Sequence, residues 1–558
     1  MTNNADENTT TTQAAAEQLP AAATGVFLRK ASGVYRSWSP FDGWTYNVLA
    51  MNVVVMIGFT YYSATYLFPG GSLFWAILLC GAFCILEGIT YAILTATMPR
   101  SGGDYIYQSR ILSGGVGSVF SFTAIVSAGA MWMAIAGWFG STLVVSPFLV
   151  LLGGTFDIGW MSDLGEWFIT PDGFFVMTLL VIAWAAIVNI WGMRPYALLQ
   201  RWSFLVGLVS LGVMLVVLAV NDHASFIEKF NAFMSSNFDQ ADAYQNVLDT
   251  AKAQGYAPDT GSGFSSTLAI VPLAAFSLIY VAWSVAQGGE IKSGNSLRAQ
   301  MIQMPGAEVF SAIVAAILSA LLVSRIGTDF LGSVGYLFTE APDSYPLPVA
   351  PLFGAFVGAL AQNGALLIIV AIAFNAWFWM WHPNITLAAS RVLLAMSFDR
   401  ILPDKVGSVH KSTHTPVFAI IAFSVVCVVF AYLYSYTSFW ELTLATAALN
   451  IVCFGVSNLA GALMPYRRPE LYRDSPAANW KIAGIPVITI TGSIFVAFTA
   501  WILYMVMADA AYAINSTRSL VFMGILYVIA IAIYVVGKIR RQKQGINVNV
   551  VYAQIPVE

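Results

Sequence analysis

Long apolar stretches fill the chain from Val48 to Val536, and polar or Pro/Gly-rich turns separate them. Each stretch is close to the roughly 20 residues that an α-helix needs to cross the hydrocarbon core of a bilayer. The pattern therefore predicts an all-α integral membrane protein with about twelve transmembrane helices. Their expected bounds are 45–67, 73–97, 116–152, 174–193, 196–221, 265–288, 306–328, 350–390, 415–435, 439–465, 483–508 and 518–537.

The positions of the basic residues orient these spans, because positively charged loops are retained on the cytoplasmic side of a membrane. With the N-terminus inside, twelve spans place 21 of the 25 Lys and Arg residues inside. The four outside are Lys229, Lys252, Arg325 and Arg518. The loop between the third and fourth spans carries acids and no basic residue, as expected for an outer loop. We predict a multi-pass protein of the plasma membrane with both termini in the cytoplasm.

The composition supports a lipid environment and argues against a nucleic-acid partner. Hydrophobic residues make up 58% of the chain and charged residues 9%, whereas soluble domains carry about 25% charge. The net charge of −3 is close to neutral. We interpret the four cysteines, which all fall inside predicted spans, as small apolar filler.

The chain is expected to form one transmembrane domain, 41–540, between two short cytoplasmic tails. Residues 1–40 begin with a polar Thr/Ala-rich run and are predicted to be disordered, and 541–558 form the other tail. The only long extramembrane loop, 222–264, is rich in Asp, Asn and Ser. It is too small for a catalytic domain, so we interpret it as a lid or a surface contact.

The sequence offers no sign of catalysis. It contains no Gly-rich phosphate loop ending in Gly-Lys-Ser/Thr and no His-Glu-x-x-His stretch. Its four histidines are too scattered for a convincing metal cage. We therefore predict no catalytic residue, no metal and no cofactor, and a helical bundle that binds or conducts a solute.

Two segments at the cytoplasmic ends of spans combine turn residues with basic anchors. In the first, 98–110, Pro99 ends the second span, and Gly102 and Gly103 allow a tight bend. The second, 390–403, reads SRVLLAMSFDRILP and also forms a helix end and a turn.

Both segments closely resemble signatures of the amino acid–polyamine–organocation (APC) family of secondary transporters, which includes amino acid permeases. The resemblance extends over roughly residues 40 to 540. It implies a 5+5 inverted repeat, the APC fold, followed by two C-terminal helices. In that fold the first and sixth spans are broken near mid-membrane, where freed backbone groups hold a polar solute away from lipid.

In the first span the resemblance points to a break, and to substrate-binding residues, at Ile57, Gly58, Phe59 and Thr60. Gly58 lowers the cost of unwinding, and Thr60 adds a hydroxyl. The family usually has a Gly-x-Gly pair here, whereas this chain has only Gly58.

In the sixth span the break is expected within residues 275–283. Four residues there are candidates for substrate binding: Phe276, Ser277, Tyr280 and Trp283. Tyr280 stands where family members usually have glycine, so it should shrink or reshape the cavity. Because no acid lies in this stretch, we expect a substrate smaller or flatter than the basic amino acids.

The driving ion is expected to be Na⁺ or H⁺. Glu87 lies deep within the second span, either as a proton carrier or as a structural carboxyl satisfied by Thr90 or a neighbouring helix. Gly207 stands where some proton-coupled relatives have a lysine.

In the eighth span, Asn384 and Thr386 could supply oxygen ligands for sodium beside carbonyls near Gly58. Pro383 frees further carbonyls. His382 could titrate, pack against Trp379 or bind substrate.

The resulting hypothesis is a permease that moves an amino acid or a related small organic amine by alternating access, as a symporter or an antiporter. An amino acid sensor on the same fold is an alternative, although such sensors usually carry a large cytoplasmic domain. A channel is a second alternative, but Pro/Gly breaks near mid-membrane favour a gated carrier.

Overall fold

The computed structural model describes residues 33–34, 36–258, 263–512, 514–553 and 555, without the side chains of residues 55, 56, 59 and 510. Most of the predicted disordered tail, 1–32, and the last residues of the chain, 556–558, lie outside the described residues.

The described chain is helical apart from one short hairpin. The α-helices of its first half are α2 Pro40–Met51, α3 Val53–Leu67, α4 Leu73–Thr97, α5 Asp104–Ile111, α6 Gly114–Ser121, α7 Ala128–Trp138, α8 Ser146–Phe156, α9 Gly159–Phe168, α10 Pro171–Trp191, α11 Met193–Val220, α12 His223–Phe238, α13 Ala243–Ala253 and α14 Gly263–Leu278. The α-helices of its second half are α15 Leu297–Gln303, α16 Pro305–Ile326, α17 Thr328–Glu340, α18 Phe353–Ala361, α19 Gly364–Phe398, α20 Val417–Tyr436, α21 Thr443–Arg467, α22 Pro469–Arg473, α23 Val487–Ala508, α24 Thr517–Lys543 and α25 Val548–Val551.

Shorter elements connect or interrupt these helices. The hairpin is β1 Lys481–Ile482 with β2 Ile485–Pro486. Two π-helical turns, η1 Phe122–Ser127 and η2 Phe139–Val145, join α6, α7 and α8 into one continuous span. The 3₁₀ turns are η3 Trp283–Ala286, η4 Gly288–Glu290, η5 Pro342–Ser344, η6 Ser438–Leu442 and η7 Ala510–Tyr512.

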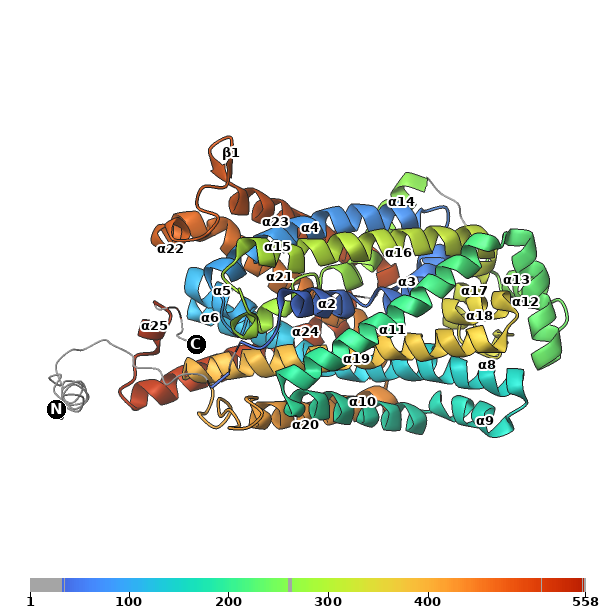
Figure 1. Ribbon diagram of the computed structural model, residues 1–558, viewed down its shortest axis with the longest axis horizontal. Helices are drawn as coiled ribbons and strands as arrows, with labels where there is room; N and C mark the ends of the chain where they lie inside the picture. Colours follow the sequence, from blue (N-terminus) through green and yellow to red (C-terminus); the bar gives the residue numbers. More distant parts are fainter. Residues whose placement is uncertain (1–32, 35, 259–262, 513, 554, 556–558) are drawn as a thin grey trace, which may run out of the picture.

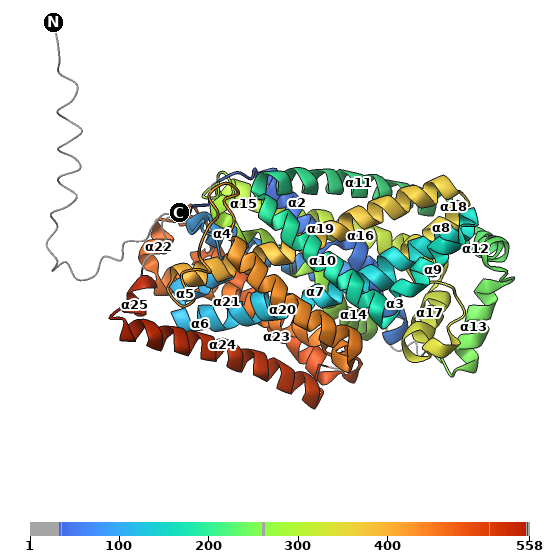
Figure 2. The same ribbon diagram turned by 90° about the horizontal axis from the view of Figure 1, so that it is seen from below.

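The long helices run side by side along the longest axis of the molecule (Figure 1). Among the described residues, eleven helices are long and apolar enough to cross a membrane, and α2 with α3 forms a broken twelfth. This confirms the predicted all-α bundle. We call the end that holds α5, α6, α15 and α22 the basic end, and the end that holds α9, α12, α13 and α17 the acidic end (Figures 1 and 2).

The eighth span differs from its expected range of 350–390. The short helix α18 is separate, and α19 begins at Gly364 and continues to Phe398. Gln362 has a left-handed backbone, with φ of 51°, and the Asn363 side chain caps α19 by accepting hydrogen bonds from the Ala365 and Leu366 amides. These turn residues stop one helix and start the next.

The predicted break at Gly58 is wrong, because the first span breaks six residues earlier, at Asn52. Asn52 has φ of 43° and ψ of 63°, in the left-handed region that Asn adopts more readily than most residues. Helix α3 then runs unbroken through Gly58. A Cβ added at Gly58 would make ordinary van der Waals contacts, at 3.4 Å with Leu352 and 3.9 Å with Phe374. Gly58 is therefore a packing position inside a regular helix.

These two positions should respond differently to substitution. Asn52→Val is expected to lower the free energy of unfolding by about 1–2 kcal/mol, because a β-branched residue is strained in the left-handed region. Gly58→Ala should leave stability unchanged or raise it by up to about 1 kcal/mol. Denaturant unfolding of both variants in detergent tests this, and an equal loss in the two would contradict the placement of the break.

The predicted break in the sixth span is confirmed. Helix α14 ends at Leu278, the four residues 279–282 are unwound, and η3 begins at Trp283. The Ser277 hydroxyl donates a hydrogen bond to the carbonyl of Met51, so the two breaks are tied to each other.

Proline in the eighth span frees a carbonyl, as expected. Pro383 lies inside α19, where its missing N–H leaves the Trp379 carbonyl without its helical donor. The Trp184 indole of α10 donates to this oxygen at 2.8 Å, and Asn189 of the same helix donates to the Pro383 carbonyl at 3.0 Å. The irregularity therefore anchors α10 against α19.

Residues 223–253 of the predicted loop form helices α12 and α13, which cover α17 and α18 at the acidic end (Figure 2). Tyr244 stacks on Phe330 with ring centroids 4.6 Å apart, and Phe226 meets Phe356 edge to face. The loop therefore forms an aromatic cap on the bundle.

Candidate functional site

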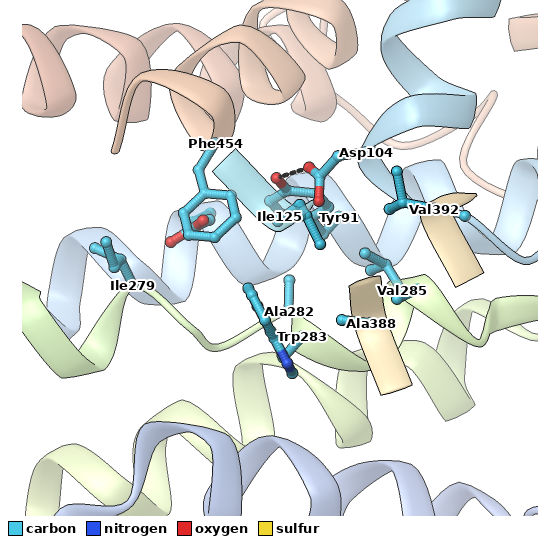
Figure 3. Close-up of a pocket in the computed structure, with 13 residues that line it drawn as sticks. Tyr91, Asp104, Ile125, Ile279, Ala282, Trp283, Val285, Ala388, Val392 and Phe454 are labelled. Carbon is cyan, nitrogen blue, oxygen red and sulfur yellow. Dashed lines mark hydrogen bonds between the residues drawn. The ribbon is translucent and has the colours of Figure 1, made fainter. Parts of the chain in front are cut away.

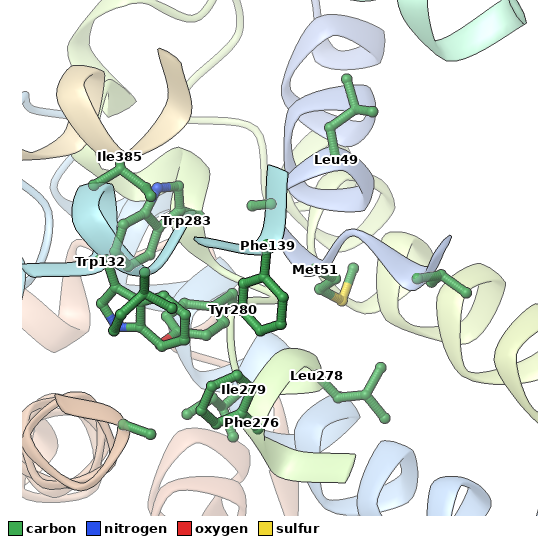
Figure 4. Close-up of a cluster of buried hydrophobic side chains, with 14 of the residues drawn as sticks. Leu49, Met51, Trp132, Phe139, Phe276, Leu278, Ile279, Tyr280, Trp283 and Ile385 are labelled. Carbon is green, nitrogen blue, oxygen red and sulfur yellow. The ribbon is translucent and has the colours of Figure 1, made fainter. Parts of the chain in front are cut away.

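A small cavity lies where the two broken spans meet the third and eighth spans. Its lining residues are Ala50, Gly129, Trp132, Tyr280, Trp283, Trp381, Asn384 and Ile385. Its volume is about 20 Å³, which is enough for a single water molecule. We call it the central cavity; Figure 4 shows several of its aromatic side chains.

Four aromatic side chains dominate the central cavity, and they meet edge to face. The ring centroids of Trp132 and Tyr280 are 6.3 Å apart, and those of Tyr280 and Trp283 are 5.2 Å apart. Trp381 lies 5.9 Å from Trp132. Such rings present electron-rich faces that attract an ammonium group, and no charged side chain lines the cavity.

Asn384 joins four spans beside this cavity. Its backbone carbonyl accepts hydrogen bonds from the Tyr46 hydroxyl at 2.9 Å and from the Trp283 indole at 3.1 Å. Its side-chain oxygen accepts one from the Tyr196 hydroxyl. The first, fifth and sixth spans are thereby held to the eighth.

The structure brings together only part of the predicted substrate site. Tyr280, Trp283 and Asn384 line the central cavity. Phe276 borders it, with its ring centroid 4.9 Å from that of Trp132, and Ser277 holds the neighbouring break.

The other candidates from the first span lie in α3, beyond the break. Ile57 and Thr60 are buried there beside Gly58, and none of the three lines the central cavity. The side chain of Phe59 lies outside the described part of the structure.

The residues predicted to bind an ion contact other protein groups. The Thr386 hydroxyl donates to the Met133 sulfur at 4.0 Å, and the His382 ring packs 4.4 Å from that of Phe378. Gly58 faces Leu352 and Phe374, while Asn384 is bound to Tyr46, Tyr196 and Trp283.

Glu87 opens into a second cavity of about 10 Å³, between the central cavity and the basic end. We call it the inner cavity; its lining residues are Glu87, Tyr91, Gly102, Asp104, Ile125, Ile279, Ala282, Trp283, Val285, Ala286, Ala388, Val392 and Phe454 (Figure 3). Trp283 lines both cavities and separates them.

Asp104 is the second carboxyl of the inner cavity. It accepts hydrogen bonds from the Tyr91 hydroxyl and, at 2.6 Å, from the Ser457 hydroxyl. Burial raises the pKa of Asp104 above its usual value, although these hydrogen bonds act in the opposite direction. This carboxyl can therefore take up a proton more readily than an exposed aspartate.

The two signature segments meet at the basic end. The Tyr105 hydroxyl of the first donates to Asp399 of the second at 2.7 Å, and Arg110 forms a two-pronged ion pair with the same carboxylate, at 2.5 and 2.9 Å. The turn at Gly102 and Gly103 also lies against the inner half of the sixth span, where the Gly102 amide donates to the Ala286 carbonyl at 2.8 Å.

A second buried ion pair and the N-terminal segment complete this closure. Arg391 binds Glu290 with both prongs, at 2.7 and 2.9 Å. Trp38, which is fully buried, pairs with the backbone of Glu290 and of Lys292, and its indole donates to the Met193 carbonyl at 2.8 Å. The two ion pairs and the contacts of Trp38 therefore lie between the cavities and the basic end.

Several residues of these sites were not predicted from sequence. Trp132, Trp381 and Tyr196 are aromatic residues within spans, and nothing in the sequence distinguishes them from the many aromatic side chains that only pack. Glu308 is different, because an acid in the first turn of the long apolar helix α16 is a signal in itself. It is fully buried next to α4.

Comparison with known proteins identifies the family. A family described as Amino acid permease matches residues 41–533, from α2 into α24. No curated protein matches the chain.

Proposed function

Because the chain belongs to the amino acid permease family, we propose that it carries a small amino acid or a related organic amine by alternating access. The observation that supports this most is a cavity between two broken helices, closed at both ends of the bundle. The family is one of transporters, so no catalytic step is needed.

The cavity favours a small amine with little side chain. The substrate ammonium group would lie against the faces of Trp132, Tyr280 and Trp283. The substrate carboxylate would bind at the unwound turn 279–282 of the sixth span. The central cavity has room for about one water molecule, so it must widen to admit an amino acid.

Release at the basic end requires its contacts to open. The Arg391–Glu290 pair links α19 to the inner end of the sixth span. The Arg110–Asp399 pair links the first signature segment to the end of α19. Separating them while α12, α13, α17 and α18 stay closed would give access from one side only. The excess of basic residues at this end supports a cytoplasmic location for it and for both termini, with the protein in the plasma membrane.

A proton is the better supported driving ion. Glu87 lies in the inner cavity beside the broken sixth span, whereas the side chains of the predicted sodium ligands Asn384 and Thr386 are bonded to Tyr196 and to the Met133 sulfur. A lysine at position 207 would have no room, because a Cβ there would overlap the Trp377 indole. The coupling proton is therefore assigned to buried carboxyl groups.

A thermal-shift screen of the purified protein tests the proposal. Amino acids, amines and carboxylates are added singly, with and without sodium. At 100 times its dissociation constant a ligand adds about 2.7 kcal/mol to stability, which gives a clear rise in the melting temperature. We expect a rise with one class of small amino acid or amine, and no requirement for sodium. No rise with any compound would contradict the proposal.

A further inference from the structure

Two buried acids lie on the second and seventh spans, which pack against each other. Glu87 of α4 and Glu308 of α16 are both 0% exposed. The two helices pack tightly here: a Cβ at Gly81 would lie 2.6 Å from that of Ala312 and 3.3 Å from Oε1 of Glu308. A Cβ at Gly88, the residue after Glu87, would lie 3.2 Å from Cδ of Pro305, three residues before Glu308, so both acids lie at this helix contact.

Neither carboxyl has a hydrogen-bond partner among the described residues. All four oxygens are buried and unpaired. A buried charge without a partner is strongly destabilising, so the pair is not stable as two carboxylates.

No cation in the described structure neutralises the pair. The buried basic side chains are Arg110, Arg391 and His382. The first two are paired with Asp399 and Glu290, and His382 lies among the aromatic rings of α19.

The titratable groups that do face the pair are neutral or acidic. Cys80, Cys84 and Tyr91 come from α4, and Asp104 comes from α5. Helices α14, α15, α21 and α23 pack against α4 without adding a buried Lys, Arg or His.

We propose that Glu87 and Glu308 together form a proton-binding site, which holds one proton between the two carboxyl groups. A single proton lets one oxygen donate a hydrogen bond to the other, which gives both groups a partner and leaves one buried charge in place of two. Glu308 is thus the second half of a site of which the sequence indicates only Glu87.

The position of the pair connects this proton to the substrate. Glu87 also lines the inner cavity, next to Ile279 and Ala282 of the unwound turn and next to Trp283. Asp104 lines the same cavity toward the basic end. A proton that leaves the Glu87 oxygen can form a new O–H bond on the Asp104 carboxylate, and the electron pair of the broken bond stays on Glu87. The coupling to transport, but not the proton binding, rests on the proposed function.

Infrared spectra of the purified protein test the shared proton without any transport assay. The protonated-carboxyl band should change in Glu87→Gln and also in Glu308→Gln. It should stay the same in Glu228→Gln, which alters an exposed acid of α12. If Glu308→Gln fails to fold, Glu308→Met removes the carboxyl and fills a similar volume. A band unchanged by the Glu308 substitution would overturn the proposal.

Transport provides the second readout. Glu308→Gln should lose proton-driven accumulation in liposomes and retain exchange of substrate across the membrane. Retained accumulation would contradict the role of the pair in coupling. A wild-type protein that transports nothing would contradict the proposed function alone, and the infrared result would still decide the proton site.

Discussion

Arg391→Met is expected to lower the free energy of unfolding by about 3–5 kcal/mol, because it leaves the Glu290 carboxylate buried without a cation. Arg391 and Glu290 are 0% and 1% exposed, and their two-pronged contact is 2.7 Å at its shorter side. The effect should be visible as a lower midpoint in denaturant unfolding of the detergent-solubilised protein.

Two further variants test whether the loss of stability comes from leaving a charge buried without its partner. Arg518→Gln breaks the exposed pair with Glu441, a 2.6 Å contact, and should cost only about 0–1 kcal/mol. Replacing both buried partners, as Arg391→Met with Glu290→Leu, should recover much of the stability lost in the single variant. If Arg391→Met costs no more than Arg518→Gln, the proposed closure of the basic end loses its main support.

Trp283→Ala is expected to weaken substrate binding about thirtyfold. A desolvated cation–π contact contributes about 2 kcal/mol to binding. Each 1.4 kcal/mol is about a factor of ten in affinity. Titration of the purified variant with the ligand found in the thermal screen measures this loss.

Two control variants accompany this one: an alanine substitution at another tryptophan, and a more conservative substitution of Trp283 itself. Trp440→Ala, at an exposed indole of η6, should bind like the wild type. Trp283→Phe keeps a smaller aromatic face, so it should fall between the two. Wild-type affinity in Trp283→Ala would place the substrate elsewhere.

The architecture could be predicted because it depends on local patterns. Span length and loop charge are written in consecutive residues, so the twelve spans follow from them. The break in the sixth span was predicted correctly, whereas the break in the first span was predicted at Gly58 and lies at Asn52. The prediction chose the glycine, but the helix is interrupted where an Asn adopts the left-handed conformation.

The rest of the site depends on packing between distant segments. Arg110 and Asp399 are 289 positions apart, and nothing local shows that one neutralises the other. Trp132 and Trp381 line the central cavity only because the third and eighth spans place them beside Tyr280. Glu308 could have been found as an intramembrane acid, but its pairing with Glu87 requires the contact of α4 and α16.

Uptake into liposomes is the most direct test of proton-driven alternating access. Wild-type protein is reconstituted with an imposed proton gradient, and the labelled ligand from the thermal screen is added outside. The predicted result is accumulation inside above the outer concentration, which a protonophore abolishes and sodium does not alter. Equilibration without accumulation under every gradient, or no entry at all, would contradict the account.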